Sequence, residues 1–569
     1  MTMLTGARGR SAAMVLVLLS VLMTTGSQAR ATHEPALVTT VSTVGAGPRT
    51  DGTWVVWSQA QESDIHSGSD IYAANLADGT LFPIATGPAS QGSYDIDDGI
   101  VIWSELSTWA SGCPENYCHV VRMRNLATGE ETTLTETSGP EFPPESGHVI
   151  SASWVVYKQW IGNHISLMAR NISTLDQPMT LTVLPDNHED VLRTIESGHV
   201  ALDGERLAWT VTTRVGPIPT VTTTMLYTMM IGDDEPVIIS SGPIVNAVDV
   251  TGDTVVYHEL RSERVIAYEV PTGETSIIGA TKSPWLTADG RYVFWTSTDI
   301  SNHSPDGLIG YDLRTDSSFR VRGDGWASHA NGDMLAWGLA VIDGVEQIHV
   351  SRIADVLPSA RRSVPDATDP DRTFTPETGH FLSWGFQDYW EVNGELPVFG
   401  YPLTEEFRER NPDTSTTHTV QYFERQRYEY HPENAGTPYD ILFGRLGVQI
   451  LEQQGRDWTD FERAGPGVPH FMPETGHAIA EQFFSYWSSH GLEFDDEGIS
   501  FRESLALFGY PISEPMMETN ADGDTILTQY FERAVFEHHP DNPAAYQVLL
   551  RRVGAELLAE RGWAQVSGS

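Results

Sequence analysis

Short apolar runs that follow a small polar turn and end in an aromatic residue recur along the first part of the chain. The seven runs are DGTWVVW (51–57), DDGIVIW (97–103), SASWVVY (151–157), DGERLAW (203–209), TGDTVVY (251–257), ADGRYVFW (288–295) and NGDMLAW (331–337). Their closing aromatic residues are 38 to 54 residues apart. Self-similarity at a spacing of this length indicates a repeat architecture.

Each unit has room for about four short strands. After most runs an alternating strand ends in a turn, as in DIYAANLADGT (70–80) and RVIAYEVPTGE (264–274). Asp-Gly favours a tight turn because glycine accepts positive φ, and a continuous apolar run predicts a strand covered on both faces. Seven such units predict an all-β, seven-bladed β-propeller over residues 36–355. We expect the strand at 36–44 to pair with the last unit, at 346–353, because this pairing would remove both open edges.

The repeats at 37–355 resemble propellers of the TolB type, which also combine a D-G turn with a "diy.ydl.tg" strand. The resemblance implies the propeller fold. The S-P-D-G that is usual in TolB is absent from this chain, so the periplasmic partners of that family are not expected here.

The C-terminal part of the chain contains a duplication. Residues 356–373, VLPSARRSVPDATDPDRT, are rich in proline, serine and charge and are predicted to link two domains. Beyond them, TPETGHFLSWGFQDYW (375–390) matches MPETGHAIAEQFFSYW (472–487), and QYFERQRYEYHPEN (421–434) matches QYFERAVFEHHPDN (529–542). We expect two copies of one module, at 374–466 and 467–563. An amphipathic helix, a hairpin and a short closing helix in each copy predict a smaller α+β tandem-repeat domain.

The stretch at 393–447 resembles the LGFP repeat of secreted and cell-wall proteins. The matching residues are FGYP (399–402), Gln421, Phe423, Gly444 and Gly447 in the first copy, and FGYP (508–511), Gln529 and Phe531 in the second. The Gly-Gly that the family has after the phenylalanine is replaced by Glu-Arg, at 424–425 and 532–533. The resemblance implies association with the cell envelope rather than catalysis.

Six aromatic residues of the tandem module are candidate ligand contacts. Such rings belong either to the hydrophobic core or to a platform on which sugar rings stack. The six are Trp390, Tyr401 and Tyr422 in the first copy, and Trp487, Tyr510 and Tyr530 in the second.

The polar residues of the module are better explained by structure than by chemistry. A following proline indicates a strand end and a turn, rather than a metal ligand, at His431 and His539. A hairpin tip or a stabilising pair explains Glu424-Arg425 better than acid-base catalysis does. The remaining candidates, His380, His477 and the carboxylates of NADGD (520–524), also have structural explanations, and no metal is predicted. The chain has no G-x-S-x-G, H-E-x-x-H or phosphate-binding glycine loop, and no cofactor is predicted.

The first 31 residues have the pattern of a secretory signal peptide. Arg8 and Arg10 precede an apolar run at 12–23, and ARA at 29–31 offers small residues before a cleavage site. The run is too short to span a bilayer comfortably, and no transmembrane segment is predicted in the mature chain. We expect a secreted or cell-surface protein, in which Cys113 and Cys118 form a local disulfide.

The charge of the chain narrows the choice of partners. Acidic residues number 77 against 34 basic ones, which gives a formal net charge of −43. Such a surface repels phosphate backbones, so neither nucleic acid nor anionic lipid is expected as a partner.

These features together predict an exported, non-enzymatic binding protein whose tandem module binds cell-wall or extracellular glycan. One alternative is a carbohydrate-active enzyme that uses propeller loops such as NHED (187–190) or the region of Asp95, Asp97 and Asp98. Carboxylates that face each other across the central channel would favour it. A second alternative is a scaffold for another extracellular protein, which an exposed apolar patch on one propeller face would favour.

Overall fold

The computed structural model describes the chain from residue 36 to residue 563, with gaps. The residues not described within this range are 42–43, 61–68, 88, 109–116, 140–146, 162–163, 175, 184–192, 216–220, 243, 283–284, 298–306, 323–324, 342–344, 363–371, 495–497 and 520–522. The predicted signal peptide, residues 1–31, lies outside the described residues. Within the described ranges, no helix is both long enough and apolar enough to cross a membrane.

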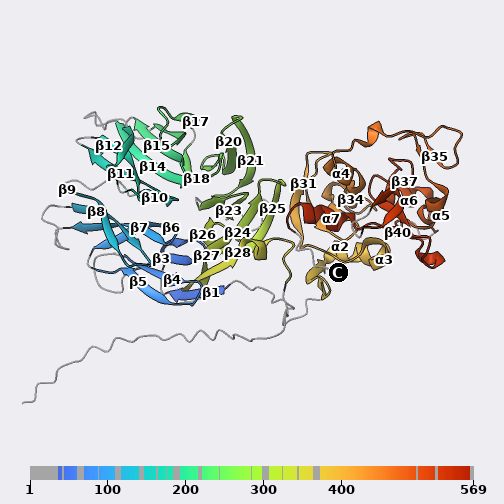
Figure 1. Cartoon of the computed structure of the whole chain (residues 1–569), viewed down its shortest axis with the longest axis horizontal. Helices are drawn as coiled ribbons and strands as arrows, with labels where there is room; N and C mark the ends of the chain where they lie inside the picture. The colour runs from blue at the N-terminus through green and yellow to red at the C-terminus, as the bar shows by residue number, and fades with distance from the viewer. Residues whose placement is uncertain are drawn as a thin grey trace, which may run out of the picture.

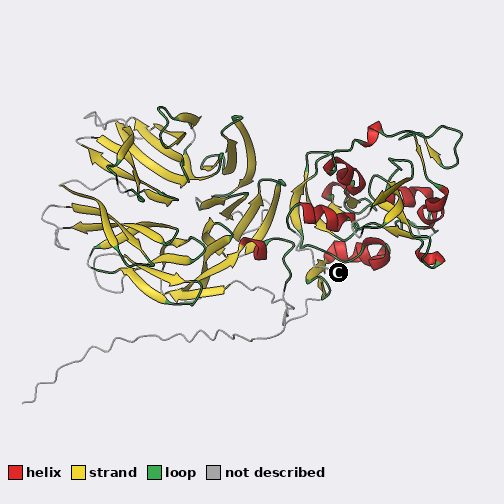
Figure 2. Ribbon diagram, viewed as in Figure 1, coloured by secondary structure: helices red, strands yellow, loops and turns green. Residues whose placement is uncertain are grey.

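Among the described residues up to 352 the elements are all strands, and helices mix with strands beyond it (Figures 1 and 2). The first three antiparallel sheets contain β2 (Val44–Thr50), β3 (Trp54–Ala60), β4 (Ser69–Asn75) and β5 (Leu81–Ala85); β6 (Ser90–Asp97), β7 (Ile100–Thr108), β8 (Tyr117–Asn125) and β9 (Glu131–Gly139); β10 (His148–Ser151), β11 (Trp154–Ile161), β12 (His164–Asn171) and β13 (Met179–Val183).

The following sheets repeat this pattern of four strands each. They contain β14 (Arg193–Asp203), β15 (Arg206–Val215), β16 (Val221–Met230) and β17 (Val237–Ser241); β18 (Val245–Thr251), β19 (Thr254–Glu259), β20 (Arg264–Glu269) and β21 (Glu274–Ala280); β22 (Leu286–Asp289), β23 (Tyr292–Ser297), β24 (Gly307–Asp312) and β25 (Ser317–Arg322); and β26 (Gly325–Asn331), β27 (Met334–Val341) and β28 (Val345–Arg352) together with β1 (Ala36–Val41). The expectation of a mostly β chain built from four-stranded units is confirmed.

The first strands of the sheets form a closed ring. Each of β2, β6, β10, β14, β18 and β22 contacts the first strand of the next sheet, and β26 contacts β2. Sheets arranged radially around an axis in this way have the architecture of a β-propeller.

The last sheet of the ring combines strands from both ends of the propeller. β1 pairs with β28, with Ala36 opposite Val350 and Val41 opposite Glu346. The predicted pairing of the first strand with the last unit is therefore confirmed for residues 36–41, whereas Val44, at the end of the predicted strand, begins β2 and pairs within the first sheet. Without this pairing, β1 and β28 would each present an open edge.

The aromatic residue that ends each recurring run is buried between sheets. These residues are Trp57, Trp103, Tyr157, Trp209, Tyr257, Trp295 and Trp337, and none is more than 4% exposed. Some of them also stack on the neighbouring strand, as Trp57 does on Tyr72, with ring centroids 6.1 Å apart. Rings of this size account for much of the apolar surface that the sheets bury against each other.

The polar residue at four of these turns has a second role beside turn formation. Its side chain accepts a hydrogen bond from the backbone of the next sheet. The N–H of Gly99 donates to Asp51 at 2.6 Å, that of Ala152 to Asp97 at 2.5 Å, that of Gly204 to Ser151 at 2.9 Å and that of Gly252 to Asp203 at 2.7 Å. The turn motif therefore also links successive sheets.

A deeper row of side chains links sheets in the same way. The N–H of Thr50 donates to His329 at 3.1 Å, that of Ile150 to Asp95 at 3.1 Å, that of Ala288 to Asp249 at 2.8 Å and that of Ala330 to Thr287 at 3.1 Å. Arg49 acts electrostatically on Asp95, Asp249 and His329, which belong to three different sheets. These four side chains, called the axial row below, therefore converge on the axis of the ring, where the guanidinium offsets two half-buried carboxylates.

The two copies of the predicted module contain the same main elements in the same order. The first has β29 (Arg372–Thr375), β30 (His380–Ser383), α2 (Trp384–Val392), α3 (Glu395–Phe399), β31 (Phe407–Arg410), β32 (Thr417–Tyr422), β33 (Arg427–Tyr430), η2 (Pro432–Asn434), β34 (Ile441–Phe443), α4 (Leu446–Gln453) and η3 (Trp458–Asp460). The second has β35 (Phe471–Met472), β36 (His477–Ala478), α5 (Glu481–Ser489), α6 (Phe501–Phe508), β37 (Met516–Thr519), β38 (Thr525–Tyr530), β39 (Val535–His538), η4 (Ala544–Tyr546), β40 (Val548–Leu550) and α7 (Val553–Glu560).

The segment predicted to be a linker is structured at both ends. At its start, α1 (Ile353–Val356) leads into Leu357, and both Val356 and Leu357 are buried. The carbonyl of Pro358 accepts a hydrogen bond from the N–H of Glu405 at 2.8 Å, and β29 begins at Arg372. Residues 363–371 lie outside the described residues. The structured start of the segment packs directly on the tandem module.

The two copies of the module are joined by two equivalent hydrogen bonds, which are called the clasp below. The N–H of Gly447, at the start of α4, donates to the carbonyl of Glu532 at 3.1 Å, and the N–H of Gly554, at the start of α7, donates to the carbonyl of Glu424 at 3.0 Å. Each closing helix therefore begins on the hairpin tip of the other copy, which supplies an acceptor for an N–H that has none within its own helix.

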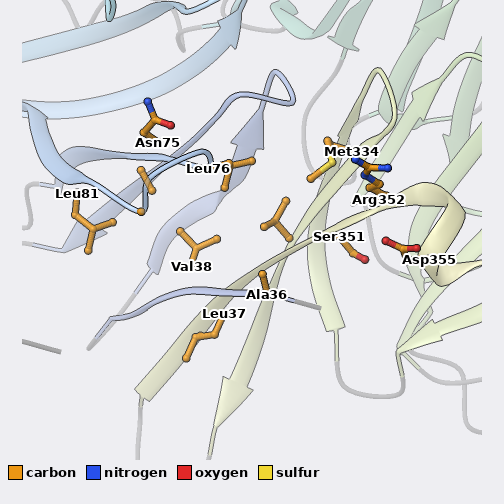
Figure 3. Close-up of a pocket in the computed structure, with 13 residues that line it drawn as sticks. Ala36, Leu37, Val38, Asn75, Leu76, Leu81, Met334, Ser351, Arg352 and Asp355 are labelled. Atoms are coloured by element: carbon orange, nitrogen blue, oxygen red, sulfur yellow. The ribbon is translucent and has the colours of Figure 1, made fainter. Parts of the chain in front are cut away.

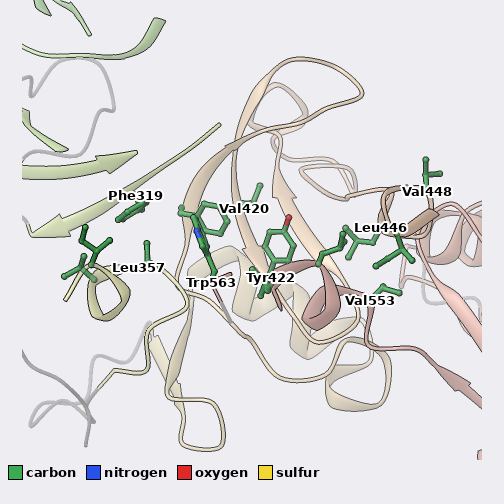
Figure 4. Packing of buried hydrophobic residues seen from close by; sticks show 14 of the residues in the cluster. Phe319, Leu357, Val420, Tyr422, Leu446, Val448, Val553 and Trp563 are labelled. Atoms are coloured by element: carbon green, nitrogen blue, oxygen red, sulfur yellow. The ribbon is translucent and has the colours of Figure 1, made fainter. Parts of the chain in front are cut away.

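The tandem module is fastened to the propeller by a strand pair and by the end of the described chain. β25 pairs with β31, so β22–β25 of the propeller and β31–β34 of the first copy form one sheet of eight strands. The ring of Trp563 packs against that of Phe319, with ring centroids 5.9 Å apart (Figure 4), and it also packs against Phe407, with ring centroids 5.0 Å apart. Its indole N–H donates to Asp312 at 2.8 Å, and Asp312 also accepts from Arg291 at 2.9 Å.

Asp249 provides a test of the axial row. Its pKa is raised to about 6 because it is buried. A carboxyl group whose folded-state pKa lies above its unfolded value of about 3.9 contributes stability that is fully present below that value and is lost as the pH rises through the folded pKa. Asp249→Asn is neutral at every pH. The difference in unfolding free energy between variant and parent should therefore shift in favour of the variant by about 1–3 kcal/mol as the pH rises from about 4 to about 8.

Urea unfolding of both proteins at the two pH values measures this shift. Asp234→Asn, at an exposed loop position, is the matched control for the loss of one carboxyl group. A constant difference for Asp249→Asn would contradict a raised pKa at the axis.

The clasp between the copies is tested with a single methyl group. A Cβ at Gly554 would lie 2.1 Å from the carbonyl oxygen of Phe423, whereas a Cβ at Gly465 would meet nothing within 4 Å. Main-chain atoms in a close contact cannot move aside without strain, so we expect Gly554→Ala to destabilise the protein by about 1–3 kcal/mol. Gly465→Ala should stay within about 0.5 kcal/mol of the parent. Equal melting temperatures for the two variants would mean that the clasp is absent in solution.

Candidate functional site

A groove on the first copy of the tandem module gathers aromatic rings and carboxylates. This groove, called the α2 groove below, lies between α2 and the β32–β33 hairpin and has a volume of about 730 Å³, within the range of small-molecule sites. The rings that line it belong to Trp384, Phe386, Tyr389, Tyr430 and Phe494, and the carboxyl groups to Asp388, Glu406, Asp440 and Glu493.

Trp384 is the most exposed ring of the α2 groove. β30 ends at Ser383, and Trp384 begins α2 with a φ of 44°. Positive φ is unfavourable for a bulky side chain, and such strain is commonly kept at functional positions. The side chain is nevertheless 60% exposed. Burial in the core therefore does not explain why a tryptophan stands here.

Tyr430 supplies a second exposed ring from the opposite wall. It ends β33, pairs across the hairpin with Thr419, and is 41% exposed. Two residues earlier on the same face, Tyr428 is fully buried and packs edge-on against Phe386 and Tyr389 of α2, with ring centroids 5.7 and 5.6 Å apart. The buried cluster around Tyr428 therefore fixes the distance between the two walls.

The α2 groove is acidic. Its lining residues include four carboxyl groups and no lysine or arginine. Burial, reinforced by the charge of Glu405, raises the pKa of Glu406 to about 7, against the opposite influence of Arg372. Near neutral pH this carboxyl group is divided between its protonated and ionised forms, so it can donate as well as accept a hydrogen bond.

One wall of the α2 groove comes from the second copy. The side-chain N–H of Asn393 donates to the carbonyl of Tyr389 at 2.8 Å, and its side-chain oxygen accepts from the N–H of Glu493 at 2.8 Å. Asn393 thereby places Glu493 and Phe494, which belong to the insert of the second copy, beside the end of α2. The site is complete only when both copies are folded together.

Three of the six aromatic residues predicted as ligand contacts are core residues. Tyr422 and Tyr530 are fully buried, and Trp487 is 1% exposed. A ring without an exposed face cannot stack on a sugar, so in this fold these three have the core role, the first of the two considered for them.

The other three predicted rings are partly exposed but lie outside the α2 groove. The indole N–H of Trp390 donates to the carbonyl of Gly400 at 3.2 Å. Tyr401 and Tyr510 follow the turn glycine of their copies, and the backbone N–H of each donates to a hairpin-tip glutamate, at 3.3 and 3.1 Å. They stay candidate contacts for a ligand at the junction of the two copies.

Sequence reasoning missed the two most exposed rings of the α2 groove. The predicted apolar face of the helix consists of Leu382, Phe386, Tyr389 and Trp390, and Trp384 lies off that face. An aromatic residue on the polar side of an amphipathic helix was the available signal. The alternation of β33 places Tyr430 on the face of Tyr428, but no sequence pattern showed which end of the strand is exposed.

The buried hydroxyls of Tyr422 and Tyr530 are each held by a glutamate and an arginine. Tyr422 donates to Glu409 at 3.1 Å and accepts from Arg427 at 3.1 Å. In the second copy the corresponding partners are Glu518, at 2.5 Å, and Arg551, at 3.4 Å.

The two arginines reach this place from different strands. Arg427 lies opposite Gly444, and the corresponding pair in the second copy is Val535 and Arg551. A Cβ at Gly444 would lie 2.6 Å from the Arg427 guanidinium, so the glycine leaves room for it. The first copy therefore carries its arginine on the hairpin strand, opposite glycine, whereas the second copy carries its arginine directly after the following strand, opposite valine.

Other predicted residues have the structural roles assigned to them. Glu424 and Arg425 form the tip of the hairpin between β32 and β33, one of the two roles expected. Buried His380 lies 3.4 Å from Glu405, and buried His477 lies 3.3 Å from Glu514. Cys118 is disulfide-bonded, and its predicted partner, Cys113, lies outside the described residues.

The carboxylates considered for catalysis link sheets of the propeller. Asp95 and Asp97 each accept a hydrogen bond from the backbone of the next sheet, and Asp97 also accepts from Asn331 at 3.2 Å. Burial raises the pKa of both. Asp98 lies at an exposed turn, and the NHED stretch at 187–190 lies outside the described residues.

A second pocket, of about 260 Å³, lies where β1 and β28 meet the β4–β5 hairpin (Figure 3). Aliphatic side chains such as Leu37, Val38 and Leu81 form much of its lining, with Arg352 and Asp355 at one side. This pocket offers fewer aromatic and carboxyl groups than the α2 groove, which is therefore the better candidate site.

Comparison with known proteins gives a likeness of fold only. No protein-family model matches the chain, and no curated protein matches it. Among solved structures, the propeller domain of the Trilobed protease from Pyrococcus furiosus is 10% identical, with a TM-score of 0.39 over 54% of this chain and 94% of that one. TolB from Acinetobacter baumannii is 13% identical, with a TM-score of 0.28 over 50% and 60%. Because these scores are below 0.5, the propeller assignment rests on the sheets and contacts described above.

The exchange of arginine positions can be tested in the first copy. Arg427 pairs with Glu429 at 3.0 Å and with Glu409 at 3.3 Å, and all three side chains are buried. Arg427→Val should cost about 3–5 kcal/mol, because it leaves the buried carboxylate of Glu429 without its arginine and that of Glu409 with Arg561 as its partner. Adding Gly444→Arg recreates the arrangement of the second copy and should restore part of that stability. Chemical unfolding of both single variants and the double variant measures the coupling. A double variant no more stable than Arg427→Val would contradict the exchange.

Proposed function

We propose that this chain is an exported, non-enzymatic binding protein. In this proposal a seven-bladed β-propeller carries a tandem LGFP-like module, and the module binds a glycan of the cell envelope or the extracellular space. The observation that carries the proposal is the α2 groove, in which the exposed rings of Trp384 and Tyr430 stand beside four carboxyl groups.

The chemistry of the α2 groove favours a neutral polysaccharide. Aromatic faces pack against the C–H faces of sugar rings, and carboxylates accept hydrogen bonds from sugar hydroxyls. A lining with four acids and no basic residue repels phosphate, sulfate and uronate groups. The negative charge of the whole chain acts in the same direction.

Binding without catalysis fits the described residues better than hydrolysis does. The propeller carboxylates that an enzyme would use, Asp95 and Asp97, are engaged in hydrogen bonds between sheets. The α2 groove, by contrast, has two exposed rings, those of Trp384 and Tyr430, and receives one wall from the second copy. Such a site suits a long ligand that passes along the surface.

The proposal is tested by retention of the mature chain, residues 32–569, on insoluble cellulose, chitin and purified cell wall. Trp384→Ala should weaken retention on the bound polysaccharide by about tenfold or more, since it removes the main stacking surface. Trp285→Ala, which removes an exposed tryptophan from the propeller, is the control and should bind as the parent does. If Trp285→Ala lost binding while Trp384→Ala kept it, the function would belong to the propeller. Binding of the parent to none of the polymers would refute the glycan proposal.

A further inference from the structure

Two histidines and a glutamate meet on the face of the β32–β33 hairpin that points away from the α2 groove. The rings of His418 and His431 have centroids 4.1 Å apart, and Glu433 follows in η2. One ligand atom from each of the three side chains lies within 4.8 Å of the others. Within the described ranges, this is the one group of three or more such side chains with the spacing of a metal site.

The two rings are held in place by the hairpin and its loop. His418, on β32, is only 8% exposed, and its Nε2 lies 2.7 Å from the Thr416 hydroxyl. Its Nδ1 lies 3.3 Å from the carbonyl of Tyr430, which binds the ring to the neighbouring strand. His431 follows that strand directly, so strand pairing fixes the distance between the rings.

Glu433 and Glu429 stand on opposite sides of the second ring. The Nδ1 of His431 lies 2.7 Å from Glu433, and its Nε2 lies 3.7 Å from Glu429. Glu429 is itself fixed by Asn411, at 2.8 Å, and by Arg427, at 3.0 Å. A histidine that binds a metal through one nitrogen and faces a fixed carboxylate with the other is the usual arrangement of a metal site and its supporting residues.

We propose that His418, His431 and Glu433 bind a divalent transition metal, with zinc as the best match. Two imidazoles and one carboxylate form a known zinc ligand set, and a fourth position stays open to water or to an external ligand. Tetrahedral coordination places ligand atoms roughly 3.3–3.5 Å apart. The Oε1 of Glu433 lies 2.7 Å from the Nδ1 of His431, so it has to move away to admit an ion, and its side chain, 59% exposed, has room to do so.

The second copy provides an internal control. At the position of His418 it has Ile526, while His539 and Asp541 stand at the positions of His431 and Glu433. With one imidazole instead of two, the second copy lacks a complete ligand set. The chain should therefore bind one metal ion and not two.

The metal site is separate from the α2 groove. Side chains alternate along β32, so Thr419 faces the groove and His418 faces the other side of the hairpin. A change in metal binding can therefore be measured without reference to glycan binding, and the proposal does not rest on the proposed function.

The experiment uses the mature full-length chain, stripped with a chelator and titrated with Zn²⁺ by calorimetry and with Co²⁺ by visible absorption. We expect one ion per chain and, because metal binds the folded state, a higher melting temperature with Zn²⁺. His418→Ile, which inserts the residue of the second copy, should weaken binding at least about 100-fold and remove the shift in melting temperature. Glu433→Gln should weaken binding about tenfold or more.

His539→Ala is the matched control, because it removes the imidazole at the position that corresponds to His431 in the second copy, and binding should be unchanged. A parent chain that binds no Zn²⁺ or Co²⁺, or a His418→Ile variant that binds as the parent does, would overturn the proposal. So would loss of the ion from His539→Ala. Circular dichroism of each variant before titration shows whether the fold is retained.

Discussion

The hydrogen bonds that the buried carboxylate of Asp312 accepts join the propeller to the tandem module. Asp312 ends β24 and accepts hydrogen bonds from Arg291, from the backbone of Arg314 and from the indole of Trp563. A buried charge without such partners would cost several kcal/mol, so the end of the described chain has to lie where its indole reaches this acid. Once placed, Trp563 covers Phe407 of the first module copy and thereby sets the module on the propeller. The position of the α2 groove follows from this contact.

The duplicated module keeps one scaffold and divides its surface chemistry unequally. The strand pairs, the clasped helices and the buried tyrosines occur in both copies, whereas Trp384 and Tyr430 of the first copy correspond to Glu481 and His538 of the second. The second copy contributes a wall of the groove through Glu493 and an acceptor for α4 through Glu532. It supports the first copy, which carries the groove and the histidine pair.

The sequence predicted what is periodic and missed what depends on distant pairs. The recurring turn and aromatic residue gave the sheets, and the unmatched strand at 36–44 gave their closure. The hydrogen bond from the N–H of Gly99 to Asp51 could not be predicted, because a carboxylate beside a glycine has the same local sequence whether or not it also contacts the next sheet. The same holds for Tyr422, whose burial depends on Glu409 and on the packing of the closing helices. His418 and His431 became neighbours only through a strand register that composition does not specify.

The clasp between the copies has a kinetic consequence. The start of α4 needs the carbonyl of Glu532, and the hairpin tip at Glu424 needs Gly554, so neither copy reaches its final form before the other exists. In the propeller, β1 likewise cannot pair until β28 has been made. A chain that emerges from its N-terminus must therefore persist for a long time with open strand edges and uncovered rings, and contacts this distant in sequence form slowly. The net charge of −43 is valuable at that stage, because it keeps incomplete copies of the chain apart until the last residues arrive.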